Sequence, residues 1–258
     1  MATSETSAGV QRVAIDPLNS PKVSIVVPAY NEAIRIGDSI RKIEEFRIRL
    51  PFNTEVLIVD DGSRDDTSAI VQKLGFSGLR LIRNETNHGK GFAVQMGALL
   101  STGEYVLVSD ADLSAPIEEL EKLLSAAEGQ NAAVVIGSRA VDRSMITIHQ
   151  SRVRELGGIL FNRMVRLFLG LDLYDTQCGF KLFKREKIRP MFEKLTIWGF
   201  GFDPELLFLA SRAGLKILEV PVRWSHADGS KIRFLRDGLR MFADLLQIRW
   251  NSIRGRYS

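Results

Sequence analysis

Two aspartates one residue apart, Asp110 and Asp112, have types and spacing that suggest chemistry. They follow Glu104–Ser109, a short apolar run that predicts a β-strand. Paired carboxylates supply the hard oxygen ligands that Mg²⁺ and Mn²⁺ prefer, and substrate phosphates often complete the coordination. The same residues can also form a solvated turn or cap a helix predicted over Ala115–Leu124. Their position at a strand end favours a metal site.

Two more corners of the predicted fold carry acids after a strand. Asp60 and Asp61 begin a turn, DDGS, after the strand Glu55–Val59, and Glu32 ends the segment PAYNE that starts at Pro28. A carboxylate at such a corner can accept hydrogen bonds from a nucleobase or a ribose, although Asp, Gly and Ser are also ordinary turn residues. Three acidic corners at strand ends together favour a nucleotide site.

Other catalytic motifs are missing from the sequence. It has neither a GxxxxGK[ST] phosphate loop nor a GxGxxG turn, which argues against P-loop hydrolases and dinucleotide-dependent oxidoreductases. One cysteine, three histidines and no GxSxG elbow disfavour structural zinc and nucleophile–histidine catalysis. The segment His88–Gly91 is either a diphosphate contact through Lys90 or a flexible turn before a helix.

Strands that alternate with helices must position these corners. Strands are predicted over Lys22–Pro28, Glu55–Val59, Leu79–Arg83, Glu104–Ser109, Ala133–Gly137 and Lys216–Val220, and helices over Asn31–Arg47, Thr67–Leu74, Gly89–Leu100, Ala115–Leu124, Arg152–Leu169, Pro204–Ala213 and Phe234–Trp250. Such alternation predicts an α/β fold with a mainly parallel sheet flanked by helices. Ligands bind beyond the carboxyl ends of the strands in these sheets, where the acidic corners fall.

The domain organisation is predicted to be simple, because no repeat or obvious linker interrupts the 258 residues. We expect a disordered segment over residues 1–20, one domain over 21–230 and a basic amphipathic helix with a tail over 231–258. The domain divides into a nucleotide-binding half (about 21–115) and an acceptor half (about 116–230).

Positive charge is concentrated late in the sequence. The chain carries a net charge of +4, but residues 223–258 hold eight Lys or Arg against three Asp, so the rest carries −1. Residues 139–166 contain six arginines against two acids. The expected partners of these stretches are phosphate groups and a membrane surface rather than nucleic acid.

Several motifs in order resemble those of a known enzyme family. They are PAYNE (28–32), VDDGSRDDT (59–67), NHGKG (87–91), SDADL (109–113), GSR (137–139), QSRVR (150–154), TQCGFKLF (176–183), GFGFDPELL (199–207) and W-x₄-GSK (224–231). The first four are similar to those of inverting family 2 glycosyltransferases, which have a single Rossmann-like GT-A domain. The others are most similar to the polyprenyl-phosphate glycosyltransferases, in particular the dolichyl-phosphate β-glucosyltransferase type.

The resemblance implies roles for individual residues. It assigns Asp110 and Asp112 to a divalent cation, Mg²⁺ or Mn²⁺, and counts Asp112, Arg139, Asp203 and Lys231 as catalytic. It assigns to substrate binding Pro28, Ala29, Tyr30, Glu32, Asp60, Asp61, Lys90, Asp110, Arg152, Arg154, Gln177, Lys181 and Ser230. Glu205 matches the second member of an acidic pair with Asp203.

The implied reaction is transfer of a hexose, expected to be glucose from UDP-glucose, to a dolichyl or undecaprenyl phosphate. A GDP-mannose donor and a saccharide hydroxyl acceptor are alternatives, and a hydroxyl needs a general base, for which Asp203, Glu205 and Asp175 are candidates. A nucleotidyltransferase and a catalytically silent binding module remain further alternatives.

The last predicted helix indicates where the enzyme works. At 100° per residue, nine apolar side chains from Phe234 to Trp250 form a broad face, with Arg236 and Arg240 opposite. This face either rests on a membrane surface or is buried against the domain. Since no run of about 18 apolar residues and no secretory signal are visible, we expect a cytoplasmic, peripheral enzyme at the cytoplasmic face of a membrane.

Overall fold

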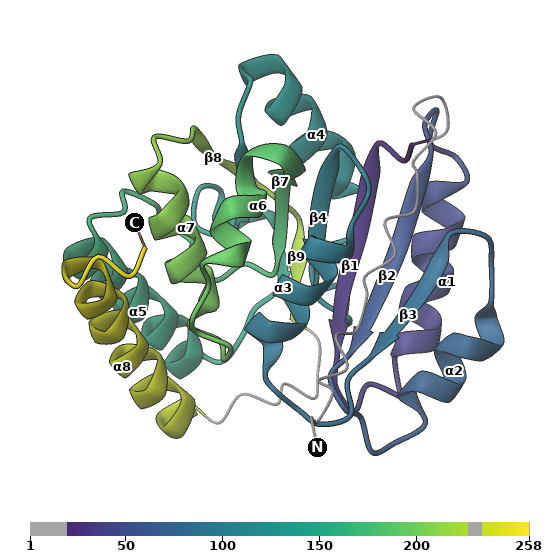
Figure 1. Cartoon of the computed structure of the whole chain (residues 1–258), viewed down its shortest axis with the longest axis horizontal. Coiled ribbons are helices and arrows are strands. Elements are labelled where there is room, and N and C mark those ends of the chain that lie inside the picture. Colours follow the sequence, from purple (N-terminus) through teal and green to yellow (C-terminus); the bar gives the residue numbers. More distant parts are fainter. Residues whose placement is uncertain (1–19, 227–233, 258) are drawn as a thin grey trace, which may run out of the picture.

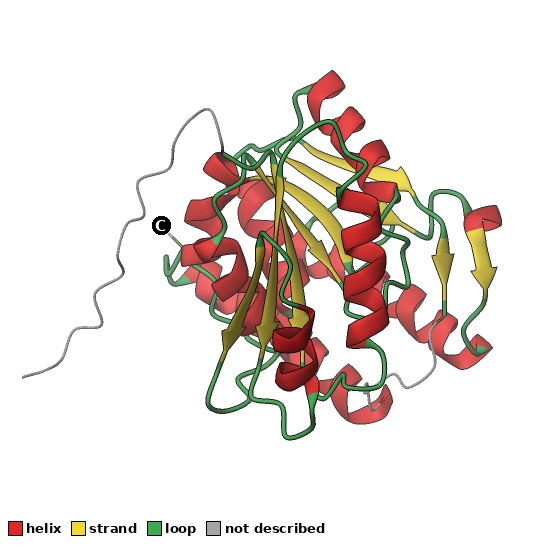
Figure 2. Cartoon of the chain, turned by 90° about the vertical axis from the view of Figure 1, so that its right-hand side faces the viewer, coloured by secondary structure: helices red, strands yellow, loops and turns green. Residues whose placement is uncertain are grey.

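A seven-stranded sheet runs through the computed structural model, which describes residues 20–226 and 234–257 (Figures 1 and 2). Its spatial order is β3-β2-β1-β4-β7-β5-β8. The strands are β1 (Val23–Ala29), β2 (Thr54–Asp60), β3 (Leu79–Arg83), β4 (Tyr105–Ser109), β5 (Val134–Ser138), β7 (Phe180–Lys184) and β8 (Ile217–Pro221). All neighbours pair in parallel except β7, which is antiparallel to both β4 and β5. The predicted α/β fold with a mainly parallel sheet is confirmed.

Helices cover both faces of the sheet (Figure 2). They are α1 (Ile36–Arg47), α2 (Thr67–Leu74), α3 (Lys90–Leu100), α4 (Glu119–Gln130), α5 (Arg152–Leu169), α6 (Arg185–Glu193), α7 (Phe202–Arg212) and α8 (Phe234–Ile253). Alternate residues of β1 face opposite sides, so Val26 packs into one core with α3, α5 and α7, whereas Ile25 and Val27 pack into another with α1 and α4. Burial on both faces explains the continuous apolar runs in the sequence.

Strand β7 is the main element that the sequence analysis does not predict, together with α6 and a small pair formed by β6 (Ile146–Ile148) and β9 (Trp224–Ser225). The sequence of β7, FKLFK, places Lys181 in the interior, which is unusual for a buried strand. Because β7 is antiparallel, it starts where β4 and β5 end. The residues just before β7 are therefore brought to the edge that holds the acidic corners.

Two groups of sequence predictions stand apart from this description. Residues 1–19, Ser230 and Lys231 lie outside the described residues, so the expected disorder and the roles of these two side chains stay predictions, as do the domain boundaries. In residues 20–226 and 234–257 no helix combines the length and the apolar content needed to cross a bilayer.

Helix α8 divides its predicted apolar face between two environments. Leu245 and Ile248 are fully buried, whereas Leu239, Leu246 and Trp250 are 73%, 46% and 54% exposed. Arg236 and Arg240 lie beside the exposed residues rather than opposite a single apolar face. Burial against the domain is therefore confirmed for Leu245 and Ile248, and contact of the exposed residues with a membrane surface stays a prediction.

Candidate active site

An open cleft of about 740 Å³ lies at the carboxyl ends of β1, β2, β4 and β5. Residues from both predicted halves and from α5 and α8 form its walls. The structure brings these predicted site residues into the lining: Pro28, Ala29, Tyr30, Glu32, Asp61, Lys90, Asp110, Asp112, Arg139, Arg154, Gln177 and Asp203. One continuous space therefore joins the acidic corners to the cationic acceptor half.

The carboxylate of Asp110 lies between a lysine and a glycine. Lys90 Nζ is 2.6 Å from Asp110 Oδ1. A Cβ atom on Gly179 would lie 1.9 Å from Asp110 Oδ2, so any other residue at position 179 would displace this carboxylate. Gly179 immediately precedes β7, which shows how the antiparallel strand shapes the site.

Asp112 is held at the other side of the same corner. Its Oδ1 accepts a hydrogen bond from the Ser114 backbone N–H at 3.0 Å, and its Oδ2 is 3.9 Å from Arg35 Nη1. Both carboxylates remain accessible, at 33% exposed for Asp110 and 27% for Asp112.

This pair fits a divalent cation that is shared with a substrate. No cluster of three or more His, Cys, Asp or Glu suited to a metal exists within the described part of the chain. Mg²⁺ commonly takes only one or two protein carboxylates when substrate phosphates and waters fill its remaining positions. Asp110 and Asp112 are therefore a suitable donor set for a cation that arrives with a diphosphate.

Asp61 fastens the loop that carries Lys90. Its carboxylate accepts hydrogen bonds from the backbone N–H groups of His88 and Gly89, at 3.0 Å and 2.7 Å to Oδ2, and from the Asn84 side chain at 2.8 Å. Gly89 has φ +116°, and a Cβ there would lie 2.4 Å from the Trp198 carbonyl oxygen. Only glycine allows this close approach, which holds the loop of the nucleotide half against the acceptor half.

Asp60 occupies a different place from the predicted one. The family resemblance predicts that Asp60 lines the nucleoside pocket, but its side chain is fully buried and absent from the cleft lining. Its carboxylate accepts hydrogen bonds from the Ser63 backbone at 2.9 Å and from the Ser68 hydroxyl. Asp60 thus holds the turn after β2, and its neighbour Asp61 reaches the cleft.

Lys181 also lies beneath the cleft rather than in it. The Lys181 side chain is only 2% exposed. Its Nζ lies 2.6 Å from Asp203 Oδ1 and donates a 2.5 Å hydrogen bond to the Cys178 carbonyl oxygen. The predicted phosphate contact through Lys181 is not formed by this geometry, because the ammonium group is spent on a buried ion pair. Asp203 itself faces the cleft.

The charges around Lys90 are coupled. Burial acts to lower the pKa of Lys90, but the carboxylates of Asp110, Asp203 and Asp112 together raise it above its usual range. Burial raises the pKa of Asp203, and the attraction of Lys181 and Lys90 offsets only part of that effect. Lys90 is therefore a permanent cation among three acids.

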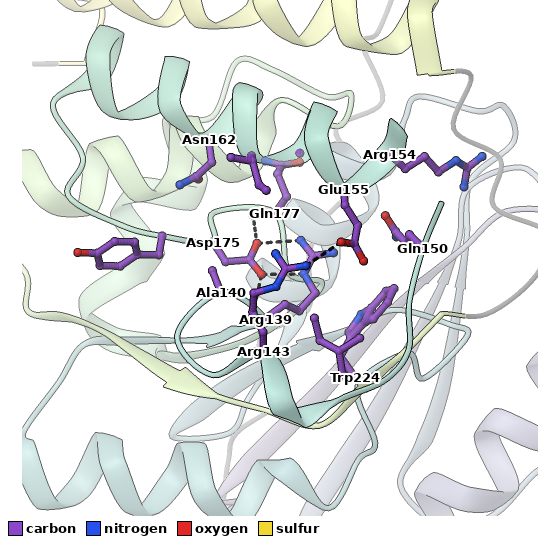
Figure 3. Close-up of a pocket in the computed structure, with 14 residues that line it drawn as sticks. Arg139, Ala140, Arg143, Gln150, Arg154, Glu155, Asn162, Asp175, Gln177 and Trp224 are labelled. Atoms are coloured by element: carbon purple, nitrogen blue, oxygen red, sulfur yellow. Dashed lines mark hydrogen bonds and ion pairs between the residues drawn. The ribbon is translucent and has the colours of Figure 1, made fainter. Parts of the chain in front are cut away.

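A smaller cavity of about 110 Å³ adjoins the cleft and shares several of its residues (Figure 3). Arg139 spans the boundary and forms a two-bonded ion pair with Asp175, at 2.7 Å from Nε and 2.8 Å from Nη2. Burial acts to raise the pKa of Asp175, but Arg139 outweighs it and holds that pKa below the usual range. The Arg139 guanidinium also lies 5.3 Å from the centre of the Trp224 ring.

Helix α5 selects one of two candidate arginines. Arg154 lines both cavities, and Figure 3 shows it near Gln150 beside the smaller one. Arg152 is exposed and absent from both linings, so the predicted binding role is supported geometrically for Arg154 alone. Two positions along a helix differ by about 200°, which explains the contrast.

Glu205 is a structural anchor. It is fully buried outside the cleft and accepts hydrogen bonds from the backbone N–H groups of Thr196 and Ile197 at 3.0 Å and 2.8 Å. The Tyr257 hydroxyl donates to it at 2.5 Å. The geometry thus excludes Glu205 from the candidate bases, and it ties the end of the described chain to the acceptor half.

Several lining residues were missed by the sequence analysis. They include Arg35, Asn87, Gln150, Gly179, Phe200, Trp224, His226 and Met241. Asn87, Gln150, Gly179, Phe200 and Trp224 belong to the family motifs of the sequence, so the sequence contains a signal for them. Arg35, His226 and Met241 carry no such signal, because only the tertiary fold brings them to the cleft.

Comparison with known proteins gives a consistent result. Residues 24–192 match Glycosyl transferase family 2. Dolichyl-phosphate beta-glucosyltransferase of Dictyostelium discoideum is 35% identical over 254 residues, covering 93% of this chain and 77% of the relative. The proteins of that name from Saccharomyces cerevisiae and Homo sapiens are each 36% identical, and each match covers 91% of this chain and 76% of the relative.

The fold is also found in solved structures. Glucosyl-3-phosphoglycerate synthase of Mycobacterium tuberculosis, crystallised with Mn²⁺, UDP and glucosyl-3-phosphoglycerate, superposes with a TM-score of 0.67 at 23% identity. The match covers 89% of this chain and 80% of that one. Another structure of the same protein holds Mg²⁺ and UDP, with a TM-score of 0.66. These neighbours share the GT-A type of α/β domain.

Proposed function

This chain belongs to glycosyl transferase family 2, and from that premise we propose that it moves glucose from UDP-glucose to a polyprenyl phosphate, with inversion at the anomeric carbon. That it is a glycosyltransferase follows from the family and from its relatives. Donor, acceptor and metal are the proposed parts. Relatives named dolichyl-phosphate beta-glucosyltransferase, similar over about nine tenths of this chain, support the acceptor class and the sugar.

The observation that carries this proposal is the single cleft shared by two kinds of charge. The accessible carboxylates of Asp110 and Asp112 line one part, and the guanidinium groups of Arg139 and Arg154 line another. A nucleotide sugar and an anionic acceptor can therefore meet in one space, with a cation partner for each.

In the donor part, Asp110 and Asp112 would hold Mg²⁺ or Mn²⁺ together with the diphosphate. When bound, such an ion neutralises the negative charge that develops on the leaving nucleoside diphosphate. Lys90 adds a second fixed positive charge at the same corner, and a preorganised charge of this kind is usually a large catalytic contribution. Tyr30 and Glu32 at the end of β1 are left to contact the nucleoside, and Asp61 at the end of β2 would act by holding the loop of His88 and Gly89 beside them.

In the acceptor part, the proposed nucleophile is an oxygen of a phosphomonoester. It forms a bond to the anomeric carbon while the bond from that carbon to the UDP oxygen breaks, and UDP leaves with the electron pair. A phosphomonoester has a second pKa of about 6 and is largely dianionic at neutral pH, so it needs no general base. It needs cations, which Arg154 and, through the Nη1 group that Asp175 does not bind, Arg139 would provide.

A hydroxyl acceptor is the second candidate, and one observation favours it. Asp203 is a buried carboxylate that faces the cleft, and burial raises its pKa towards the range of a general base. Its ion pair with Lys181 opposes proton uptake, which favours the phosphate acceptor.

We also propose that the reaction takes place at the cytoplasmic face of a membrane, because a polyprenyl phosphate resides there. The exposed apolar residues of α8 support this location.

A panel of donors and acceptors tests the proposal. Purified enzyme with Mg²⁺ or Mn²⁺ is given UDP-glucose or GDP-mannose, together with dolichyl phosphate, undecaprenyl phosphate or a saccharide. Mass spectrometry of the organic extract is expected to show a hexosyl polyprenyl phosphate, and UDP is expected in the aqueous phase. A product that stays in water would support the hydroxyl acceptor, and release of pyrophosphate would indicate a nucleotidyltransferase.

A further inference from the structure

Helix α5 carries an apolar stripe on the face turned away from the core. Four side chains spaced by three, four and seven residues lie on that face, and each is more than half exposed: Val153 65%, Leu156 68%, Leu160 57% and Leu167 80%. This spacing aligns them along one side of a helix. The opposite side, with Phe161, Val165 and Leu169, is buried in the core. The exposed leucines are therefore not needed to fold the helix onto the domain.

Helix α8 repeats the arrangement. Its outward side chains are Leu239 at 73%, Leu246 at 46%, Trp250 at 54% and Ile253 at 71% exposed. They are spaced by seven, four and three residues and again share one side. Leu245 and Ile248 on the inner side are fully buried.

The two stripes adjoin. Figure 1 shows α5 and α8 side by side at the end of the molecule remote from α1 and α2. Phe168 of α5 meets Phe242 of α8 with ring centres 5.7 Å apart. Phe242 is one helical turn from both Leu239 and Leu246, and Phe168 follows Leu167 directly. We call the eight exposed residues of the two stripes the α5–α8 apolar surface.

Exposed positive charge surrounds this surface. The helices contribute exposed arginines at positions 152, 163, 166, 236, 240 and 249, and Arg254 follows α8 directly. The acidic residues of the two helices are less exposed than the arginines: Glu155 and Asp237 are half-buried, and Asp244 is buried. Arg166 pairs with Asp172 from the next loop. A face that combines apolar and basic side chains in this way complements an anionic lipid surface.

We propose that the α5–α8 apolar surface docks onto an anionic bilayer, with its leucines and Trp250 at the boundary of headgroups and acyl chains. A second copy of the chain fits less well, because a symmetric contact would set the arginines of one copy against those of the other. Exposed apolar groups with flanking arginines satisfy both layers of a membrane surface at once.

The helices that carry the α5–α8 apolar surface also line the cleft. The purpose that we assign to the docking rests on the proposed function. Gly157 and Phe161 of α5 and Gly238 and Met241 of α8 all line the cleft. A Cβ added to Gly158 or Gly238 would meet no atom of a neighbouring element within 4 Å among the described residues. The bilayer would then lie against the helices that lead to the cationic acceptor part.

Vesicle flotation tests the docking without any polyprenyl phosphate. Full-length protein is mixed with vesicles of phosphatidylcholine, alone or with phosphatidylserine added. Binding is expected with phosphatidylserine and is expected to weaken as salt is raised. Leu160→Glu and Leu246→Glu should each weaken binding about tenfold or more, because each places a charge where an apolar side chain would be buried. Ile48→Glu, a matched change at a 68% exposed residue beyond α1, should bind like the unchanged protein.

Trp250 supplies a second readout that does not depend on a variant folding well. Its fluorescence should shift to shorter wavelength on phosphatidylserine vesicles, and Trp250→Phe should abolish that shift although Trp198 and Trp224 remain. Circular dichroism checks that each variant is folded. Equal vesicle binding by the protein and both glutamate variants would overturn the proposal. A stable dimer in light scattering that Leu160→Glu dissociates would also overturn it.

The docking and the chemistry fail separately. Turnover of a short-chain polyprenyl phosphate in detergent should persist in Leu160→Glu and Leu246→Glu, because the docking surface is not needed in micelles. If no polyprenyl phosphate is glucosylated by the unchanged protein, the proposed function is wrong, and the vesicle result still decides the docking.

Discussion

Lys90 Nζ lies 2.6 Å from Oδ1 of Asp110, so a lysine from the start of α3 already compensates one carboxylate of the proposed cation site. The negative charges of Asp203 and Asp112 also raise the pKa of Lys90. A cation that joins this corner must therefore share Asp110 with a fixed positive charge, and the diphosphate is the group that can satisfy both.

Lys90→Met should separate the effect of Lys90 on the leaving group from its effect on cation binding. We expect kcat/KM for the nucleotide sugar to fall by about 10²-fold or more, because a preorganised charge on the leaving group is removed. Mn²⁺ titrated without nucleotide should bind more tightly, since the repulsion from Lys90 is gone. The control is Lys187→Met, an exposed lysine of α6, which should alter neither quantity. Unchanged kcat/KM in Lys90→Met would exclude the proposed contact.

Asp112→Asn should remove most metal-dependent turnover. Replacing one of two carboxylate ligands should lower kcat by about 10³-fold, and chelation of the metal by EDTA should have a similar effect on the unchanged enzyme. Titration with Mg²⁺ and Mn²⁺ measures whether activity returns. Asp38→Asn, a change at a 76% exposed aspartate of α1, should leave turnover unaltered. Turnover of the EDTA-treated enzyme at the full rate would contradict the metal proposal.

Asp203→Asn should distinguish the two acceptor classes. With a phosphate acceptor, kcat should fall about tenfold at most, and the acid limb of the pH–rate profile should stay near the acceptor's second pKa of about 6. With a hydroxyl acceptor, the loss of a general base should lower kcat by about 10²–10⁴-fold. The acid limb of the pH–rate profile, which would then report the Asp203 carboxylate, should disappear. Because the single variant leaves Lys181 buried without its partner, Asp203→Asn/Lys181→Met should be measured beside it.

The pair of Asp175 and Arg139 should make stability depend on acid pH. The pKa of Asp175 is lowered from its ordinary value of 3.8, so its stabilisation is present above that value and is lost as pH falls through the lower folded pKa. Asp175→Asn should cost about 1.5–3 kcal/mol at pH 7, because half-buried Arg139 loses its hydrogen bonds to a charged partner. When the unfolding free energy is measured with urea at several pH values from 7 to 3, it should change less with pH in the variant than in the unchanged protein. An unchanged pH dependence would contradict this assignment.

Tyr257→Phe should weaken the fold without altering the chemistry. It removes the hydroxyl that donates to buried Glu205, and leaving that carboxylate with one donor fewer should cost about 1–3 kcal/mol of unfolding free energy. Because burial and then Glu205 raise the pKa of Tyr257, the contribution is present at neutral pH and is lost only as strongly alkaline pH is reached. Urea unfolding and kcat at low temperature measure both effects. A tenfold loss of kcat in the folded variant would return Glu205 to the list of active-site residues.

Local patterns account for what the sequence predicts well. The strands β1, β2 and β4 are buried on both faces, and their apolar runs end at the acidic corners, so both the strands and Asp61, Asp110 and Asp112 could be placed. The parallel sheet then brings these corners together without knowledge of any long-range contact.

Long-range partners account for what it misses. Asp60 and Asp61 are adjacent, and only the turn contacts of Ser63 and Ser68 show that Asp60 is structural. Glu205 fits a catalytic motif, but its partner Tyr257 is 52 residues away. Strand β7 contains the buried Lys181, whose charge is tolerated only because Asp203 is opposite.

The position of β7 also governs how the chain can assemble during synthesis. Strands β1 to β4 emerge first and can pair among themselves, but the neighbour of β4 on its free side is β7, which emerges after β5. Until then β4, whose five residues are all buried in the finished sheet, is an open edge, and β5 has no partner from the earlier strands. An unpaired apolar edge is a place where nascent chains associate wrongly. Residues 105–109 therefore stay an unpaired apolar edge until residues 180–184 have been synthesised.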